Sequence, residues 1–189
     1  MLADERRVDQ PWRSRQVPAK LIPNPTRGLD MADIAENLHS AGITLPDVVP
    51  PVVEGYTPAF APFIRAGSQI HISGRLAKRG DEIFAGKLGA GISLEEGRAA
   101  ARDVAIELLS VLNQAAGGLD RVSRIVKILV FVNGAPGFID PHRVADGASQ
   151  LLVEILGEPG RHARSAVVAA DLPFGACLEI EMIAEITDA

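Results

Sequence analysis

Polar and hydrophobic residues alternate near the middle of the chain, and the pattern predicts strands. Ile70 and Ile72 fall on one face, with polar residues between and after them, so residues 64–74 are expected to form one strand. A turn at residues 79–81 and a short strand over residues 82–87 complete a predicted hairpin. The globular body is expected to begin near residue 60, after a proline-rich approach.

Hydrophobic residues then recur with a helical period in two longer segments. Ser93 and Glu96 form a capping box, which opens a long helix that ends at the glycine pair beginning with Gly117. A second helix is expected to start after Asp140, where proline occupies the first helical position, and to run to about residue 156. A short helical pattern covers residues 31–41.

Three further segments have the composition of strands. Residues 122–132 are rich in β-branched side chains and are the best candidate for a central strand. Residues 165–170 and 177–186 are the last two strands, joined by a turn at residues 172–175. Hairpins mixed with two long helices predict an α+β fold, with both helices on one face of a single sheet.

The last predicted strand carries acidic residues on one face only. The expected helix-facing set is Leu178, Ile180, Met182, Ala184 and Ile186, and the opposite set is Cys177, Glu179, Glu181, Ile183 and Glu185. Residues 165–170 lack this alternation, which predicts that both faces of this strand are packed against other parts of the protein. A second subunit against the polar-bearing face would reconcile the two patterns. Otherwise these acids form a solvated face, and Arg164 a weak surface ion pair.

Composition narrows the function classes. The 189 residues include 47% hydrophobic and 23% charged residues with a net charge of −5, which weighs against a nucleic-acid partner. The single cysteine excludes an intramolecular disulfide, and no apolar run is long enough for a bilayer. Without a secretory signal pattern, a cytoplasmic location and no membrane partner are expected.

The first thirty residues differ from the rest of the chain. They contain six basic residues and several prolines without sustained periodicity, so they are expected to be a disordered leader or an upstream extension. A nucleic-acid or targeting arm is the alternative. Residues 31–189 are then expected to form a single domain.

The motifs near the C-terminus resemble those of a known family. Arg164-Ser165, Leu172-Pro173 and Glu179-Ile180-Glu181, together with residues 130–132, Ser73-Gly74 and residues 65–67, resemble the RidA/YjgF family of enamine/imine deaminases, once labelled L-PSP endoribonucleases. The resemblance covers residues 32–186 and suggests a longer-chain subgroup. It implies a chorismate-mutase-like fold with a mixed sheet, and a homotrimer with sites in the clefts between subunits.

The resemblance also implies roles for individual residues. Arg164 matches the arginine that holds the substrate carboxylate, and Glu179 matches the acid that positions the attacking water. Ala166 stands where backbone lines the site, and Ser73-Gly74 matches the pocket wall. The implied reaction is hydrolysis of a 2-imino acid, or its enamine, to a 2-oxo acid and ammonia, with no cofactor and no metal.

Two positions depart from the family pattern. Phe60 falls where many active members have tyrosine, and Pro136 falls near a position that is often asparagine. Both changes remove polar groups from the expected pocket, so bulkier or more apolar imines are the expected substrates. The alternatives are a non-catalytic trimer that binds a small carboxylate through Arg164, and an RNA-cleaving translation inhibitor.

The remaining reactive residues lack the spacing of a known site. The four histidines have no metal-ligand spacing, and His162, two residues before Arg164, is expected to hydrogen-bond in a loop or interface. Cys177 is expected to be a packed thiol. The glycines of residues 86–91 lack the lysine of a phosphate-binding loop and are expected to form an ordinary loop.

Overall fold

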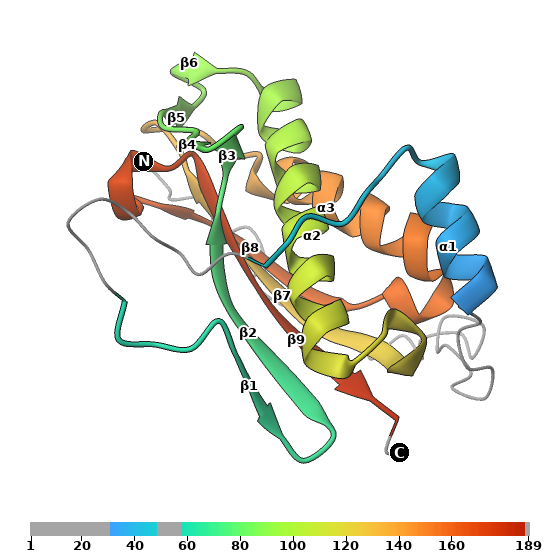
Figure 1. The fold of residues 1–189 in the computed structure, drawn as a ribbon. Coiled ribbons are helices and arrows are strands. Elements are labelled where there is room, and N and C mark those ends of the chain that lie inside the picture. Colours follow the sequence, from blue (N-terminus) through green and yellow to red (C-terminus); the bar gives the residue numbers. More distant parts are fainter. Residues whose placement is uncertain (1–30, 49–57, 188–189) are drawn as a thin grey trace, which may run out of the picture.

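A computed structural model describes residues 31–48 and 58–187 and places three helices on one face of a five-stranded sheet (Figure 1). The expectation for residues 1–30 lies outside the described part of the chain. The helices are α1 (Met31–Ser40), α2 (Leu94–Ala116) and α3 (Pro141–Leu156), with short 3-10 turns at Leu119–Arg121, Glu158–Gly160 and Pro173–Gly175. The main-sheet strands are β1 (Phe63–Ala66), β2 (Gln69–Leu76), β7 (Val122–Asn133), β8 (Ala163–Ala169) and β9 (Leu178–Ile186).

The strand order is β1-β2-β9-β7-β8, and only the β7–β8 pair is parallel. The sheet is therefore mixed, as the family resemblance implied. The β-branched strand β7 is an inner strand, but the middle position belongs to β9. The parallel pairing of β7 with β8 is possible because α3 forms the crossover between them.

The turn predicted at residues 79–81 is confirmed, because Arg79 pairs with Glu82 across it, but the strands of the predicted hairpin are wrong in detail. Residues 64–74 do not form one strand, because the chain turns at Gly67, whose φ of 62° favours glycine, and β1 folds back on β2. Residues 82–87 do not join the main sheet. They contribute to two small ladders, β3 (Lys78–Arg79) with β4 (Glu82–Ile83) and β5 (Lys87–Leu88) with β6 (Gly91–Ile92).

The core lies between the sheet and the helices. The predicted helix-facing residues of β9 are all at most 2% exposed, which confirms the alternation of that strand. The capping box of Ser93 and Glu96 is present, and Gly117 ends α2 with a φ of 76°. At Gly147, α3 approaches α2 so closely that a β-carbon would lie 2.9 Å from the carbonyl carbon of Arg98.

Helix α1 belongs to this core, which corrects the expectation that the globular body begins near residue 60. Ile34 is 2% exposed within the hydrophobic core, and Asn37 donates a hydrogen bond to the Ile155 carbonyl of α3 at 3.0 Å. The structure thus has a third helix beside the two that were expected to cover the sheet.

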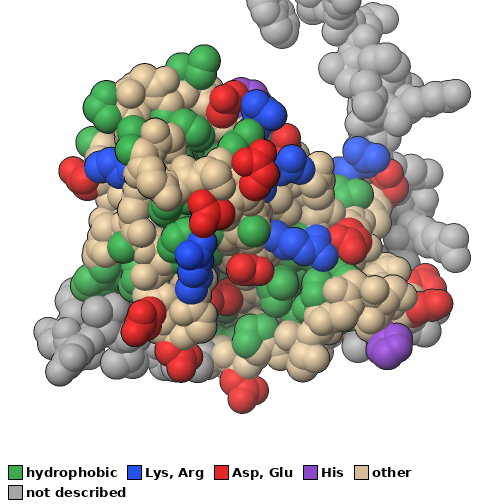
Figure 2. Space-filling model, turned by 90° about the horizontal axis from the view of Figure 1, so that it is seen from above, with side chains coloured by type: hydrophobic (Ala, Val, Ile, Leu, Met, Phe, Trp, Pro, Cys, Tyr) green, Lys and Arg blue, Asp and Glu red, His purple; other side chains and the backbone are tan. Residues whose placement is uncertain are grey.

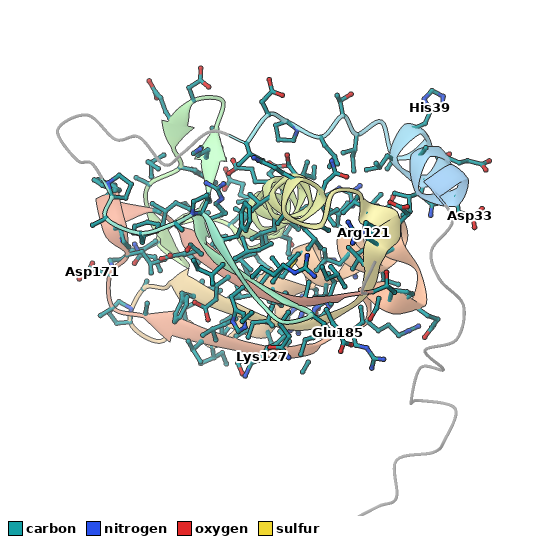
Figure 3. All side chains as sticks on the ribbon, turned by 60° about the horizontal axis from the view of Figure 1, so that its bottom comes forward. Asp33, His39, Arg121, Lys127, Asp171 and Glu185 are labelled. Carbon is teal, nitrogen blue, oxygen red and sulfur yellow. The ribbon has the colours of Figure 1, made fainter. Side chains whose placement is uncertain are left out.

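The sheet face remote from the helices carries polar and apolar side chains. Lys127 lies on this face, away from the helices (Figure 3). Strand β8 is an edge strand of the chain, and its Val167 and Val168 are 45% and 41% exposed. The described residues of one chain therefore do not supply the expected cover on both sides of β8. No helix in the described ranges is long and apolar enough to cross a membrane.

Candidate active site

Glu179 lies in a niche that strand β2 opens for its carboxylate. On the open sheet face, Glu179 is paired with Phe131 of β7 and Leu76 of β2. The β2–β9 register shifts between Ile72 and Arg75, so the segment containing Gly74 is an irregularity in the ladder. A β-carbon on Gly74 would overlap the Glu179 carboxylate, lying 2.7 Å from its Cδ. Only glycine leaves this space.

Ser73, next to Gly74, holds the segment that precedes β1 by two hydrogen bonds. Its Oγ donates a hydrogen bond to the Ala61 carbonyl at 2.7 Å, and its backbone N–H donates to the Pro62 carbonyl at 3.0 Å. Phe60, the residue before Ala61, is 50% exposed. The structure therefore places Gly74 against Glu179, with Ser73 beside it in the strand and hydrogen-bonded to the residue that follows Phe60.

The environment of Glu179 favours its protonated form. Burial raises the pKa of the Glu179 carboxyl above its ordinary value, and the negative charge of Glu181 adds to the rise. A carboxyl group whose pKa moves toward neutrality is better matched to taking up and returning a proton at physiological pH. This location and shift are what a general base or a water-positioning acid requires.

Arg164 lies on the other face of the sheet. Its strand partner is Ile128, a fully buried residue of the helix-facing side, and the guanidinium reaches α3. Arg164 Nη1 donates to Asp146 Oδ1 at 2.9 Å and to Ser149 Oγ at 3.0 Å. Ala166 follows on the same face and packs partly against the core.

One chain does not bring Arg164 and Glu179 together. They are two strands apart, because β7 separates β8 from β9, and their partners on β7 are Ile128 and Phe131. Two strand spacings and three residues along the strand give a separation of roughly 14 Å between their Cα atoms. Their side chains also project from opposite faces. A single ligand of a few atoms cannot contact both within one subunit.

His162 extends the contacts of Arg164, which confirms its expected hydrogen-bonding role. Its Nδ1 lies 2.6 Å from the Gly160 carbonyl and must donate, because a carbonyl oxygen only accepts. In the neutral ring Nε2 is then an acceptor, and it receives the Ser149 hydroxyl at 3.0 Å. Burial, with a contribution from the charge of Arg164, lowers the pKa of His162 and favours this neutral form.

Asp146 and Ser149 were not identified from the sequence as site residues. They are three residues apart on α3, the spacing that places two side chains on one helix face. That spacing is the only sequence signal that they act together. Their link to Arg164 depends on how α3 packs over β8, which no local pattern specifies.

Lys87 ties together three segments beside the start of β9. Its Nζ donates to Asn133 Oδ1 at 2.7 Å, to the Ala170 carbonyl at 2.6 Å and to Asp171 Oδ1 at 3.1 Å. Asn133, which is 2% exposed, donates in turn to the Ala176 carbonyl at 3.1 Å. The loop between β8 and β9 is thereby anchored at the end of the sheet where β9 begins, close in sequence to Glu179.

Cys177 is a packed thiol, as expected, but it does not share the open face with the glutamates. It precedes β9, is fully buried, and burial raises its pKa to about 11. A thiol with this pKa is a poor nucleophile at neutral pH. Among the residues that the structure describes, no three His, Cys, Asp or Glu side chains are grouped so as to hold a metal ion.

A cavity of about 190 Å³ lies elsewhere, on the helix side of the sheet. Arg75 of β2 and Glu107 of α2 line it, and Lys78 forms an ion pair with Glu107 at 3.7 Å. Glu179 does not line this cavity. We therefore place the candidate site at the niche of Glu179 and at Arg164, and not in this cavity.

Comparison with known proteins identifies the family of the chain. Residues 35–186 match the model of the family described as "YjgF/chorismate mutase-like, putative endoribonuclease". The Trypanosoma cruzi protein TCP17 is 41% identical over 157 residues, which is 82% of this chain and 95% of the relative.

Solved structures agree with the family match. Atu1372 from Agrobacterium tumefaciens superposes with a TM-score of 0.74 at 34% identity, covering 84% of this chain and 96% of the other. RidA from an Antarctic Psychrobacter matches with a TM-score of 0.50 at 26% identity, covering 75% and 96%. The chain belongs to the YjgF/chorismate mutase-like family.

Proposed function

We propose that the protein hydrolyses 2-imino acids, and the enamines in equilibrium with them, to 2-oxo acids and ammonia. The observation that carries this proposal is the bonding of Arg164. Among the described residues, its hydrogen bonds use Nη1 alone. A guanidinium with its remaining edge available offers two parallel N–H donors, which match the two oxygens of a carboxylate.

The proposed site is shared between subunits of a homotrimer. Because Arg164 and Glu179 project from opposite faces of the sheet, one substrate can meet both only if they come from different chains. The edge position of β8 and the exposed Val167 of the open face support contact with a second copy. The trimeric state itself is proposed from the family resemblance.

The proposed reaction needs no group beyond these side chains and water. The substrate carboxylate binds to Arg164, and Glu179 accepts a proton from a water whose oxygen attacks the C=N carbon. The π electrons move to nitrogen, which takes up a proton, and a carbinolamine forms. The hydroxyl proton is then transferred to the amino nitrogen, the C–N bond breaks, and ammonia departs to leave a 2-oxo acid. Holding the imine and the attacking water in the correct relative position supplies much of the rate acceleration.

The substrate pocket is proposed to favour apolar side chains. Phe60 is half-exposed, precedes the residue to which Ser73 is hydrogen-bonded, and would bring a ring without a hydroxyl group to the pocket. Ser73 and Gly74 would form the pocket wall, and the backbone at Ala166 would line it on the arginine side. Imines with larger aliphatic side chains are therefore expected to be used at least as well as the smallest one.

Two other functions make different predictions for the same residues. A carboxylate-binding protein without activity would bind 2-oxo acids through Arg164 but would not accelerate hydrolysis. An RNA-cleaving protein, as the family description suggests, would need a basic surface. Acidic and basic side chains are interspersed on the face seen in Figure 2, and the net charge is −5. Neither observation favours the RNA-cleaving function.

The direct test is an assay of the purified full chain. A pyridoxal-phosphate-dependent dehydratase would generate 2-aminoacrylate and its four-carbon analogue, and ammonia release would be followed with and without the protein. We expect acceleration by the wild type and loss of it in Arg164→Ala, with Arg102→Ala as a control for removing an arginine elsewhere. No acceleration with either imine would overturn the proposed function. RNA binding with a steep salt dependence would favour the RNA alternative.

A further inference from the structure

Arg164 is held by a directed chain of hydrogen bonds. Nη1 has two hydrogens, and the structure assigns one to Asp146 Oδ1 at 2.9 Å and the other to Ser149 Oγ at 3.0 Å. The Ser149 hydroxyl then donates to His162 Nε2 at 3.0 Å. Arg164 thus donates to Ser149, and Ser149 donates to His162. These hydrogen bonds have one consistent arrangement of protons while His162 is neutral.

These hydrogen bonds determine which edge of the guanidinium can bind a carboxylate. A carboxylate can bind end-on, through Nη1 and Nη2, or side-on, through Nη2 and Nε. Since both Nη1 hydrogens are used, the end-on arrangement would require breaking a bond to Asp146 or Ser149. The side-on edge has no such conflict among the described residues.

We propose that Asp146 and Ser149 are positioning residues, which hold the Arg164 guanidinium so that its Nη2–Nε edge binds the substrate carboxylate. The inference rests on the proposed function, because it assumes that Arg164 binds the substrate. It adds a role for α3, which otherwise only covers the sheet. A fixed guanidinium loses little side-chain entropy on binding, so its affinity for a carboxylate is higher than that of a free arginine.

A purely structural ion pair is the competing explanation, and α3 provides the matched control. Glu154 of the same helix pairs with Arg102 of α2 at 2.7 Å, and this pair has no contact with Arg164. If Asp146 acts only by tying α3 to the rest of the fold, Glu154→Gln and Asp146→Asn should have similar consequences. If Asp146 positions Arg164, only Asp146→Asn should affect substrate binding.

The experiment measures ligand binding and turnover separately. Binding of 2-oxobutanoate would be measured by calorimetry, and kcat and KM with the matching imine, in wild type, Asp146→Asn, Ser149→Ala, Ser149→Thr and Glu154→Gln. Asp146→Asn replaces a charged acceptor with a neutral amide oxygen, and Ser149→Ala removes one acceptor of Arg164 Nη1. Each change should weaken 2-oxobutanoate binding and raise KM about tenfold. Since the carboxylate is bound equally before and during the reaction, kcat should change far less. Ser149→Thr, which keeps the hydroxyl, should restore binding.

The outcomes distinguish failure of this inference from failure of the proposed function. If the wild type turns over the imine and Arg164→Ala does not, but Asp146→Asn and Ser149→Ala match the wild type, the positioning role is overturned and the proposed function stands. An equal loss in Glu154→Gln would also overturn it, because the effect would then be structural. If the wild type neither binds 2-oxobutanoate nor accelerates hydrolysis, both fail together.

Discussion

The carboxylate of Glu179 lies against Gly74 so closely that any side chain in place of the glycine hydrogen would displace it. A β-carbon at that position would be 2.7 Å from Glu179 Cδ and 3.0 Å from its Cγ. The glycine is therefore part of the candidate site, because it determines where the carboxylate lies. It acts through the shape of strand β2 and contributes no chemical group.

Replacing Gly74 with alanine should damage activity more than folding. The new methyl group displaces the end of the flexible Glu179 side chain, which can rotate away at modest cost, but the carboxylate then leaves its position. A misplacement of about 1 Å can lower the rate about 100-fold. We expect kcat/KM for the imine to fall by that order while the melting temperature changes little. Unchanged activity would show that the niche does not position Glu179.

Replacing Glu179 with glutamine should stabilise the protein at neutral pH and abolish turnover. A carboxyl whose pKa is raised in the folded state binds more protons there than in the unfolded chain, so its contribution to stability declines as pH rises from about 4 through the folded pKa. Glutamine stays neutral. Urea unfolding at pH 7 and pH 4 should show a stabilisation at pH 7 that shrinks toward pH 4.

The exposed Glu181 provides the control for that effect. Its charge contributes to the raised pKa of Glu179, so Glu181→Gln should lower that pKa. If ionised Glu179 is the base, the acid limb of the pH–rate profile should move to lower pH in Glu181→Gln, while turnover persists. An unmoved profile would argue that Glu179 is not the titrating base.

His162 should make stability depend on pH in the opposite direction. Its pKa is lowered in the folded state, so between that pKa and the ordinary value of about 6.5 the unfolded chain binds more protons. Stability should therefore rise with pH across this window. In His162→Gln, urea unfolding at a series of pH values between 5 and 7.5 should show a shallower rise than in the wild type. An identical slope would contradict the buried neutral ring.

Gly147 should tolerate no side chain, for a reason of helix packing. Glycine-to-alanine changes inside a helix usually stabilise it, but here the β-carbon would meet the backbone carbonyl group of Arg98 on α2. A backbone carbonyl group in a helix cannot rotate away from the new methyl group, whereas a side chain could. Gly147→Ala is expected to lower the free energy of unfolding by about 1–3 kcal/mol, measured by chemical denaturation. A more stable variant would contradict the close α2–α3 contact.

The parts of the fold with a local signal were predicted correctly. The capping box at Ser93 and the period-two alternation of β9 depend on neighbouring residues, and both are present. The turn at Gly67 was missed because a single glycine in a strand-like segment can also mark a bulge or a close backbone approach, so it does not by itself specify a turn. The turn at residues 79–81 was predicted, but the pairing of β5 with β6 was missed because hydrogen-bond partners are not encoded in strand propensity.

The candidate site was predictable only as a list of residues. The family motifs indicated Arg164 and Glu179, but not that they project from opposite faces of the sheet. That fact follows from the register, in which Arg164 is paired with buried Ile128 and Glu179 with Phe131 on the open face. The contacts of Asp146 with Arg164 depend on tertiary packing, which a single sequence does not specify.

The central claim, that each site takes Arg164 from one chain and Glu179 from another, is tested most directly by mixing two inactive variants. Arg164→Ala and Glu179→Gln would be unfolded together, refolded, and checked for hybrid oligomers by native mass spectrometry. In randomly mixed oligomers about one quarter of the sites regain one intact copy of each residue, so we predict recovery of about a quarter of wild-type imine hydrolysis. Hybrids with no more activity than the two variants alone would contradict the shared site.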